Sequence, residues 1–67
     1  MSIKYYQDGK AISERKAFTI ICAGYFNAGY SCPDELKALW ESRSESEESR
    51  EQIFELSGYE LEIEIDD

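Results

Sequence analysis

The side chains of this chain that could do chemistry are its carboxylates. There are fifteen aspartates and glutamates among 67 residues, and there is no histidine. The commonest general base and the commonest neutral metal ligand are therefore missing. Paired carboxylates can hydrolyse glycosides, but in so acidic a chain close pairs arise from density alone, and so small a domain leaves little room for a cleft. We expect a protein that is not an enzyme and has no catalytic residue.

The sequence also contains no motif for metal binding or thiol catalysis. Cys22 and Cys32 have no histidine partner and no CxxC spacing, so neither thiol catalysis nor a zinc site is expected. The acids do not follow the spacing of a calcium-binding loop, and the glycines are too scattered for a phosphate loop. We expect no metal and no cofactor. Cys22 lies in an apolar helix pattern and is expected to be a small core side chain.

The acids at the end of the chain alternate with apolar residues. In the stretch ELEIEIDD, Leu61, Ile63 and Ile65 are separated by acids. Successive side chains of a strand point to opposite faces, so the alternation predicts one apolar face and one face of carboxylates about 6.7 Å apart. The acids of this row are Glu60, Glu62, Glu64 and Asp66. Such a row is a candidate surface for a basic protein partner.

Two further sets of acids are spaced for a helix, at i, i+4, i+7 and at i, i+4, i+8. On a helix each set would form a stripe of like charge, which costs roughly 0.2–0.5 kcal/mol per i, i+4 pair. Arg43 and Arg50, both spaced to reach Glu47, would offset only part of this repulsion. A self-repelling pattern in a small domain indicates a use outside the domain. The sets are Glu41, Glu45 and Glu48, and Glu47, Glu51 and Glu55.

The two halves of the chain differ in charge. Residues 1–33 carry four basic and two acidic side chains, whereas residues 34–67 carry three basic and thirteen acidic ones, which gives a net charge of −8. Direct binding to DNA, RNA or an anionic membrane needs Lys and Arg against phosphates, so it is not expected. The complementary partner is a basic protein.

The acids also have an interpretation that needs no partner. Exposed carboxylates keep small proteins soluble and monomeric, and a monomer is expected here. Glutamate on an outer strand face also blocks edge-to-edge aggregation. The chain has two acidic rows in one half, and most of its positive charge lies in the other half. This asymmetry favours binding of a basic partner over a role in solubility alone.

Hydropathy predicts neither export nor a membrane span. The segment MSIKYYQDGK lacks the apolar core of a signal peptide, and no apolar run reaches the ~20 residues of a membrane helix. We expect a cytoplasmic protein. Its cysteines would then stay reduced, although two cysteines could form one bridge.

The elements that position these acids follow from turn and capping residues. Asp8-Gly9 between two short strand-like runs, 3–7 and 10–12, predicts a two-residue hairpin. Ser13 as N-cap and Gly29 as stop predict a helix over 14–28, in which Gly24 could let another backbone come close. Ser31-x-x-Asp34 fits a capping box for a second helix.

The segment ESRSESEESRE, residues 41–51, contains no apolar residue. Either one long helix passes through it, or a break near 44–46 begins a third helix. Four serines, which compete for local backbone bonds, favour the break. Gly58 is expected to end the last helix, and 59–65 to form the last strand.

The result is a single α+β domain over 1–67, ordered β-β-α-α(-α)-β, with a three-stranded antiparallel sheet packed on helices. Clean alternation is typical of such a sheet with one wet face. The outer face should carry Lys4, Tyr6 and the acids of the last strand, and Tyr6 could contact a partner or pack across strands. The inner face should carry Ile3, Tyr5, Ile12, Tyr59, Leu61, Ile63 and Ile65.

In size, acidity and layout the chain resembles the small acidic proteins that phages use against bacterial defences, notably anti-CRISPR proteins and DNA-mimic anti-restriction proteins. The resemblance covers the whole chain as format and charge, contains no shared motif and assigns no residue. It implies a non-enzymatic inhibitor that occupies the basic surface of a nucleic-acid-binding protein or ribonucleoprotein complex in the bacterial host cell. The basic patch Lys10, Arg15 and Lys16 indicates a one-sided binder.

A second class of function stays open. The chain could be a regulatory or adaptor module, antitoxin-like or prophage-encoded, that binds a basic protein without mimicry. Tyr6, Phe26 or Tyr30 would then form an apolar hot spot with the acids as its rim. A structural protein with an incidental surface is a third possibility.

Overall fold

A tight hairpin begins the fold. In the computed structural model, which describes residues 2–66, β1 (Ser2–Gln7) and β2 (Lys10–Ile12) pair antiparallel around Asp8 and Gly9. Both turn residues have positive φ, 52° and 83°, as the favoured two-residue turns allow. The predicted hairpin is confirmed.

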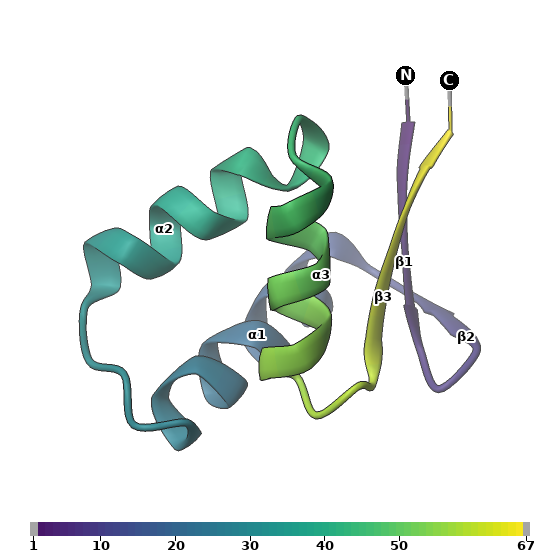
Figure 1. Cartoon of the computed structure of the whole chain (residues 1–67). Helices are drawn as coiled ribbons and strands as arrows, with labels where there is room; N and C mark the ends of the chain where they lie inside the picture. Colours follow the sequence, from purple (N-terminus) through teal and green to yellow (C-terminus); the bar gives the residue numbers. More distant parts are fainter. Residues whose placement is uncertain (1, 67) are drawn as a thin grey trace.

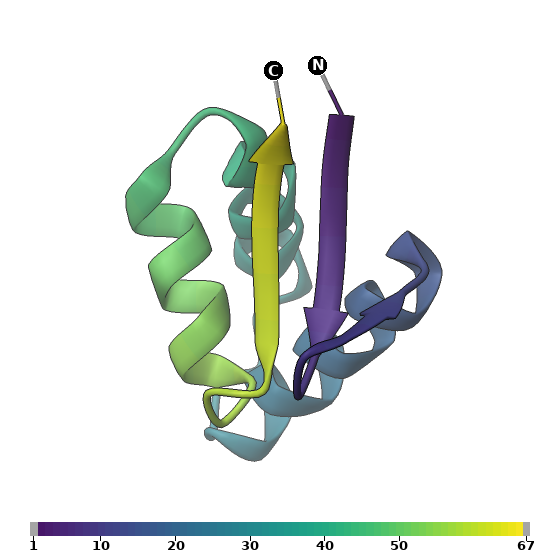
Figure 2. The same cartoon turned by 90° about the vertical axis from the view of Figure 1, so that its right-hand side faces the viewer.

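The third strand completes one antiparallel sheet. β3 (Leu61–Asp66) pairs with β1 along its whole length, so that the order is β2-β1-β3 and β1 lies in the centre. All the helices lie on one side of this sheet and leave the other face bare (Figure 1). Viewed onto that bare face, β3 and β1 run side by side, with β2 beyond β1 (Figure 2). The predicted α+β architecture is confirmed.

Capping residues decide where the helices begin. α1 (Glu14–Asn27) is capped by Ser13, whose hydroxyl accepts from the Lys16 N–H at 3.1 Å, and the chain turns at Gly29 with a φ of 96°. The predicted capping box of α2 (Pro33–Glu41) is wrong. Cys32 is its N-cap and makes no side-chain bond, because Pro33, with its fixed φ, is the residue suited to the first helical position.

The serine-rich segment breaks the helix, as expected. After α2 a short 3-10 helix, η1 (Ser42–Ser44), leads to Ser46, which caps α3 (Glu47–Leu56) by accepting from the Ser49 N–H at 3.3 Å. The hydroxyls of Ser42 and Ser49 lie 2.6 Å apart across the break. Serine side chains therefore replace helical backbone bonds at this point.

The core lies between the sheet and the helices. Its buried members are Tyr5, Ala17, Ile21, Tyr25, Leu36, Ile53 and Leu61. Gly24 brings α1 against the end of α3: a Cβ at this position would overlap the backbone carbonyl of Leu56. The expected close backbone approach is confirmed. No helix within residues 2–66 is long and apolar enough to cross a membrane.

Tyr59 is not on the inner sheet face, which corrects the prediction. Gly58 and Tyr59 both have positive φ, 75° and 64°, so the chain reverses over two residues and β3 begins at Leu61 instead of 59. Tyr59 is 67% exposed and packs edge-on against Phe54, with ring centroids 5.3 Å apart. Leu61 takes the inward position and is completely buried.

Candidate functional site: an acidic sheet face

Strand pairing places the acids of β3 on the bare face of the sheet. Residues directly opposite in an antiparallel pair share a face, and Tyr5, opposite Ile63, is buried under the helices. The alternate residues therefore point away from the helices, and the three acids among them are exposed. We call this surface the acidic sheet face; it consists of Glu62, Glu64 and Asp66 of β3 with Lys4 and Tyr6 of β1.

Lys4 lies within the acidic sheet face. It is paired with Glu64 across the strands, and its Nζ is 3.6 Å from a carboxylate oxygen of Asp66. Both partners of this ion pair are more than half exposed, so it contributes little to stability. The face therefore presents three carboxylates and one amine.

Tyr6 points outward, as expected, but it is half-buried. It lies opposite Glu62 on one side and Ala11 of β2 on the other. This position fits a tyrosine that packs across strands and leaves part of its ring for a partner.

Glu60 lies just before β3. Its carbonyl accepts from the Asp8 N–H at 3.2 Å, which extends the β1–β3 ladder by one bond, and its residue is exposed. The row inside the regular strand thus holds three of the four predicted carboxylates.

The predicted stripe of Glu41, Glu45 and Glu48 does not form a helix face. Glu41 is the last residue of α2, Glu45 follows η1, and Glu48 lies in the first turn of α3. The i, i+4, i+7 spacing assumed a continuous helix, and the break at Ser42–Ser46 removes it. All three residues are exposed, but no common axis aligns them.

The second predicted stripe does lie on one element. Glu47, Glu51 and Glu55 all belong to α3 and keep their i, i+4, i+8 spacing. Glu47 and Glu51 line a hollow of about 330 Å³ together with Glu62 and Ile63 of β3. Two acids of α3, Glu47 and Glu51, therefore adjoin the acidic sheet face.

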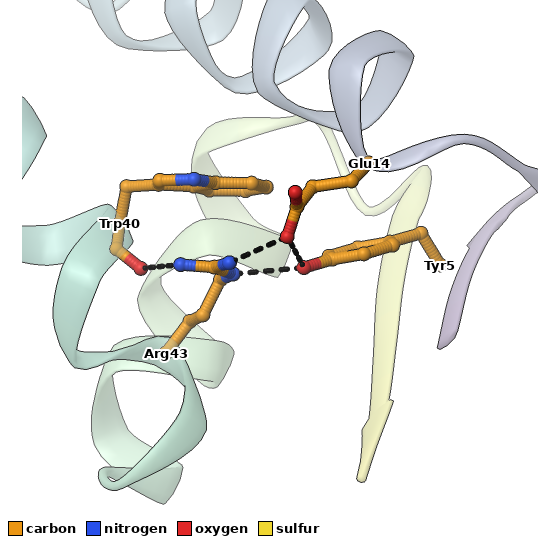
Figure 3. A network of polar contacts seen from close by, with 4 residues as sticks. All are labelled: Tyr5, Glu14, Trp40 and Arg43. Carbon is orange, nitrogen blue, oxygen red and sulfur yellow. Dashed lines mark hydrogen bonds and ion pairs between the residues drawn. The ribbon is translucent and has the colours of Figure 1, made fainter. Parts of the chain in front are cut away.

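Arg43 does not offset the helix acids as expected; it forms a network with Tyr5, Glu14 and Trp40 (Figure 3). Its Nε donates to the Tyr5 hydroxyl at 2.9 Å, its Nη1 to the Trp40 carbonyl at 2.7 Å, and its Nη2 to a Glu14 carboxylate oxygen at 2.7 Å. The guanidinium carbon lies 4.3 Å from the Trp40 ring centre, a cation–π distance. The Arg43 network ties β1, α1, α2 and η1 together.

The other arginine of this segment, Arg50, also bonds to the backbone, and it lines the hollow that contains Glu47 and Glu51. Nη1 of Arg50 donates to the Arg43 carbonyl at 2.8 Å. Of the ion pairs described within residues 2–66, none joins Arg43 or Arg50 to Glu47. The acids on α3 are thus less neutralised than their spacing from these arginines predicts.

Ionisation fixes the Arg43 network at neutral pH. Hydrogen bonds from Tyr5 and then Arg43 lower the pKa of Glu14, while burial is the main cause that raises the pKa of Tyr5. Glu14 therefore stays a carboxylate and Tyr5 stays a neutral donor, with its hydroxyl 3.0 Å from Glu14. Because neither Glu14 nor Tyr5 changes its protonation near neutral pH, we assign the Arg43 network a structural role.

The cysteines and acids of the described chain form no cluster of three or more that could hold a metal ion. Cys22 and Cys32 are both free thiols. Burial raises the pKa of the half-buried Cys22 thiol, which disfavours its reactive thiolate.

A second surface lies between α1 and α2. Phe18, Phe26 and Trp40 line an apolar groove of about 550 Å³, and Phe18 and Phe26 are 38% and 48% exposed. We call it the aromatic groove. The sequence contained a signal for it, since Phe18, Cys22 and Phe26 follow an i, i+4, i+8 spacing, a second apolar stripe on α1. Tyr30 lies apart, stacked on Tyr25 with ring centroids 5.1 Å apart.

Comparison of the chain with protein-family models, with curated proteins and with solved structures found no match. Two surfaces of the described residues are candidates for binding a partner. The acidic sheet face is charged and built on a paired strand, whereas the aromatic groove is apolar and built between two helices.

Proposed function

We propose that this protein is a non-enzymatic inhibitor that occupies the basic nucleic-acid-binding surface of a protein or ribonucleoprotein complex, as anti-CRISPR and DNA-mimic proteins do. The observation that carries the proposal is the row of Glu62, Glu64 and Asp66 on a sheet face without helices. Basic surfaces that bind nucleic acid attract such a row by the same electrostatic steering that brings them their own ligand.

The β3 row is less densely charged than a nucleic-acid strand, so a second group of acids, on α3, is needed to match it. Carboxylates on alternate strand residues are about 6.7 Å apart, whereas one strand of DNA carries a phosphate about every 3.4 Å along its axis. The β3 row alone therefore has about half the linear charge of a nucleic-acid strand. Glu47 and Glu51 of α3, which share a hollow with Glu62, supply carboxylates that increase it.

The strand also limits the cost of binding. β3 is paired with β1 over all six of its residues, so the carboxylates start from a fixed backbone. Preorganisation of this kind reduces the entropy lost on association.

A second candidate function rests on the aromatic groove. An adaptor that anchors Phe18 and Phe26 in a partner would use apolar burial, with charge only at the rim. Its affinity would change little with salt. The acidic sheet face, by contrast, should lose affinity steeply between about 50 and 200 mM salt.

The experiment uses phage growth as its readout, because growth reports inhibition whichever complex the chain binds. The chain is expressed in bacteria that carry one of a panel of CRISPR or restriction systems, and the plating efficiency of a targeted phage is measured. We expect the wild-type chain to restore plating against at least one system. The sheet-face variant, E62Q/E64Q/D66N, should lose this effect, and K4Q should retain or strengthen it.

A matched control separates position from net charge. The helix-end variant, E41Q/E45Q/E48Q, removes the same three negative charges from the total of −8 and leaves the acidic sheet face intact. It should inhibit almost as well as the wild type. Equal loss in both variants would show that only net charge matters, and full activity of the sheet-face variant would contradict the proposal.

A further inference from the structure

The two edges of the sheet differ in a way that the proposed function does not use. β2, at one edge, has three residues, whereas β3, at the other, has six residues in unbroken register with β1. Natural edge strands are usually protected by shortness, proline, lysine or a bulge. β3, LEIEID, has none of these protections; what protects it is its acids and the packing of α3 against it.

Hydrogen-bond parity shows which backbone groups of β3 are open. The Asp8 N–H donates to the Glu60 carbonyl, and hydrogen-bonded pairs recur at every second residue of an antiparallel ladder. Glu62, Glu64 and Asp66 therefore direct their backbone groups to β1, while Leu61, Ile63 and Ile65 direct theirs to the outer edge. The Leu61 N–H confirms this direction because it donates to the Ser57 hydroxyl at 3.0 Å. Within residues 2–66 only β1 pairs with β3, so Ile63 and Ile65 present an open edge.

We infer that the open edge of β3 receives an extended basic segment of the partner protein as a fourth strand. The inference rests on the proposed function for the sign of the partner's charge and adds how the partner is held. Main-chain bonds to Ile63 and Ile65 supply the pairing, as in other cases of strand addition.

Charge complementarity selects this occupant. On the bare side, side chains of an added strand lie beside Glu62, Glu64 and Asp66, where opposite charges in cross-strand positions are favourable. A second copy of the chain would instead set its own acids against these, which is unfavourable. The acids thus reject self-association and accept lysine or arginine.

The helix side of the edge also fits a basic strand. The hollow between α3 and β3 is lined by Phe54 and Ile63 and carries one base, Arg50, against three acids, Glu47, Glu51 and Glu62. A lysine or arginine side chain pointing into it can lay its aliphatic stem on the apolar residues and bring its charge to the carboxylates.

The first test titrates the whole protein with a synthetic ten-residue peptide of alternating lysine and threonine and follows amide hydrogen exchange by NMR. With saturating peptide, exchange at the Ile63 and Ile65 N–H groups should slow at least tenfold. Exchange at Glu62 and Glu64, already paired with β1, should change little. A peptide of alternating glutamate and threonine should have no effect.

Three results would overturn the inference: no binding of the lysine peptide, binding that leaves exchange at Ile63 and Ile65 unchanged, or protection of these amides by the free protein that rises with its concentration. The last would show that a second copy covers the edge.

The second test separates this inference from the proposed function. The chain is made by chemical ligation with N-methyl groups on Ile63 and Ile65, which removes both edge donors and leaves every side chain and the β1 pairing in place. Loss of inhibition of the purified defence complex, measured in vitro, supports strand addition. Retained inhibition that the sheet-face variant still abolishes would leave the proposed function standing and reject the added strand.

Discussion

Replacing Arg43 by methionine tests the Arg43 network. The change removes charge-assisted hydrogen bonds to the Tyr5 hydroxyl and the Trp40 carbonyl, each worth roughly 1.5 kcal/mol or more in net terms. The ion pair to Glu14, whose side chain is 62% exposed, adds at most about 1 kcal/mol after screening. Contact of methionine with the Trp40 ring replaces part of the lost cation–π attraction. We expect a loss of about 2–4 kcal/mol.

This loss is large for so small a domain. A chain of this length is stable by roughly 3–10 kcal/mol, and each kcal/mol shifts the melting temperature by about 4–8 °C. Thermal unfolding of R43M should therefore show a melting temperature lowered by about 10–30 °C, and urea unfolding should show the loss in unfolding free energy. Both are followed by Trp40 fluorescence and circular dichroism. R43K, which keeps the charge and loses the planar fork, should fall between R43M and the wild type.

A double-mutant cycle with Y5F checks that the effect belongs to the network. Y5F removes the hydroxyl that accepts from Nε of Arg43 and should cost about 1 kcal/mol. Because both changes break the same bond, the double variant should lose at least about 0.5 kcal/mol less than the sum of the single losses. Additive losses, or an R43M variant within about 0.5 kcal/mol of the wild type, would refute the reasoning.

Two further changes test the packing and the ionisation of the fold. Alanine in place of a helical glycine normally stabilises a protein by up to about 1 kcal/mol. G24A should instead destabilise it by about 1–3 kcal/mol, because the new Cβ would overlap the Leu56 carbonyl. A raised melting temperature of G24A would contradict the close approach of the two helices. The pKa of Glu14 is lowered from its ordinary 4.5, so its contribution to stability is present above that pH and is lost as the pH falls through the lowered pKa. The difference in unfolding free energy between wild type and E14Q should thus be constant from pH 7 to about 5 and shrink below 4.5; a difference that does not change down to about pH 2 would contradict the assignment.

Local signals were enough to predict most of the fold. Asp8-Gly9 specifies a turn that few other pairs can make, and Ser13 satisfies a helix N–H. The alternation in β3 then assigns each acid to a face, since a strand has only two. These features depend on residues that are close in the chain, which is why a single sequence reveals them.

The errors came from interactions that spacing cannot show. Arg43 bonds to Tyr5, 38 residues away. No local sequence pattern predicts that its guanidinium lies against the Trp40 ring and not beside the glutamates of its own segment. The stripe of Glu41, Glu45 and Glu48 required a helix through a segment where a break was already favoured, so the two predictions conflicted. Tyr59 was misplaced because the chain reverses over two residues with positive φ, one of which is not glycine.

The central claim is that the acidic sheet face replaces nucleic acid on a basic surface, and competition measures it most directly. With a purified complex that the phage assay identifies as the target, the dissociation constants of the protein and of an oligonucleotide ligand are measured alone, together, and between 50 and 200 mM salt. We expect mutually exclusive binding and a slope of the logarithm of the association constant against log salt of about −3 or steeper, by analogy with about −0.9 per phosphate. The sheet-face variant should make this slope shallower by about 3. Simultaneous binding of protein and oligonucleotide, or an affinity indifferent to salt, would contradict the claim.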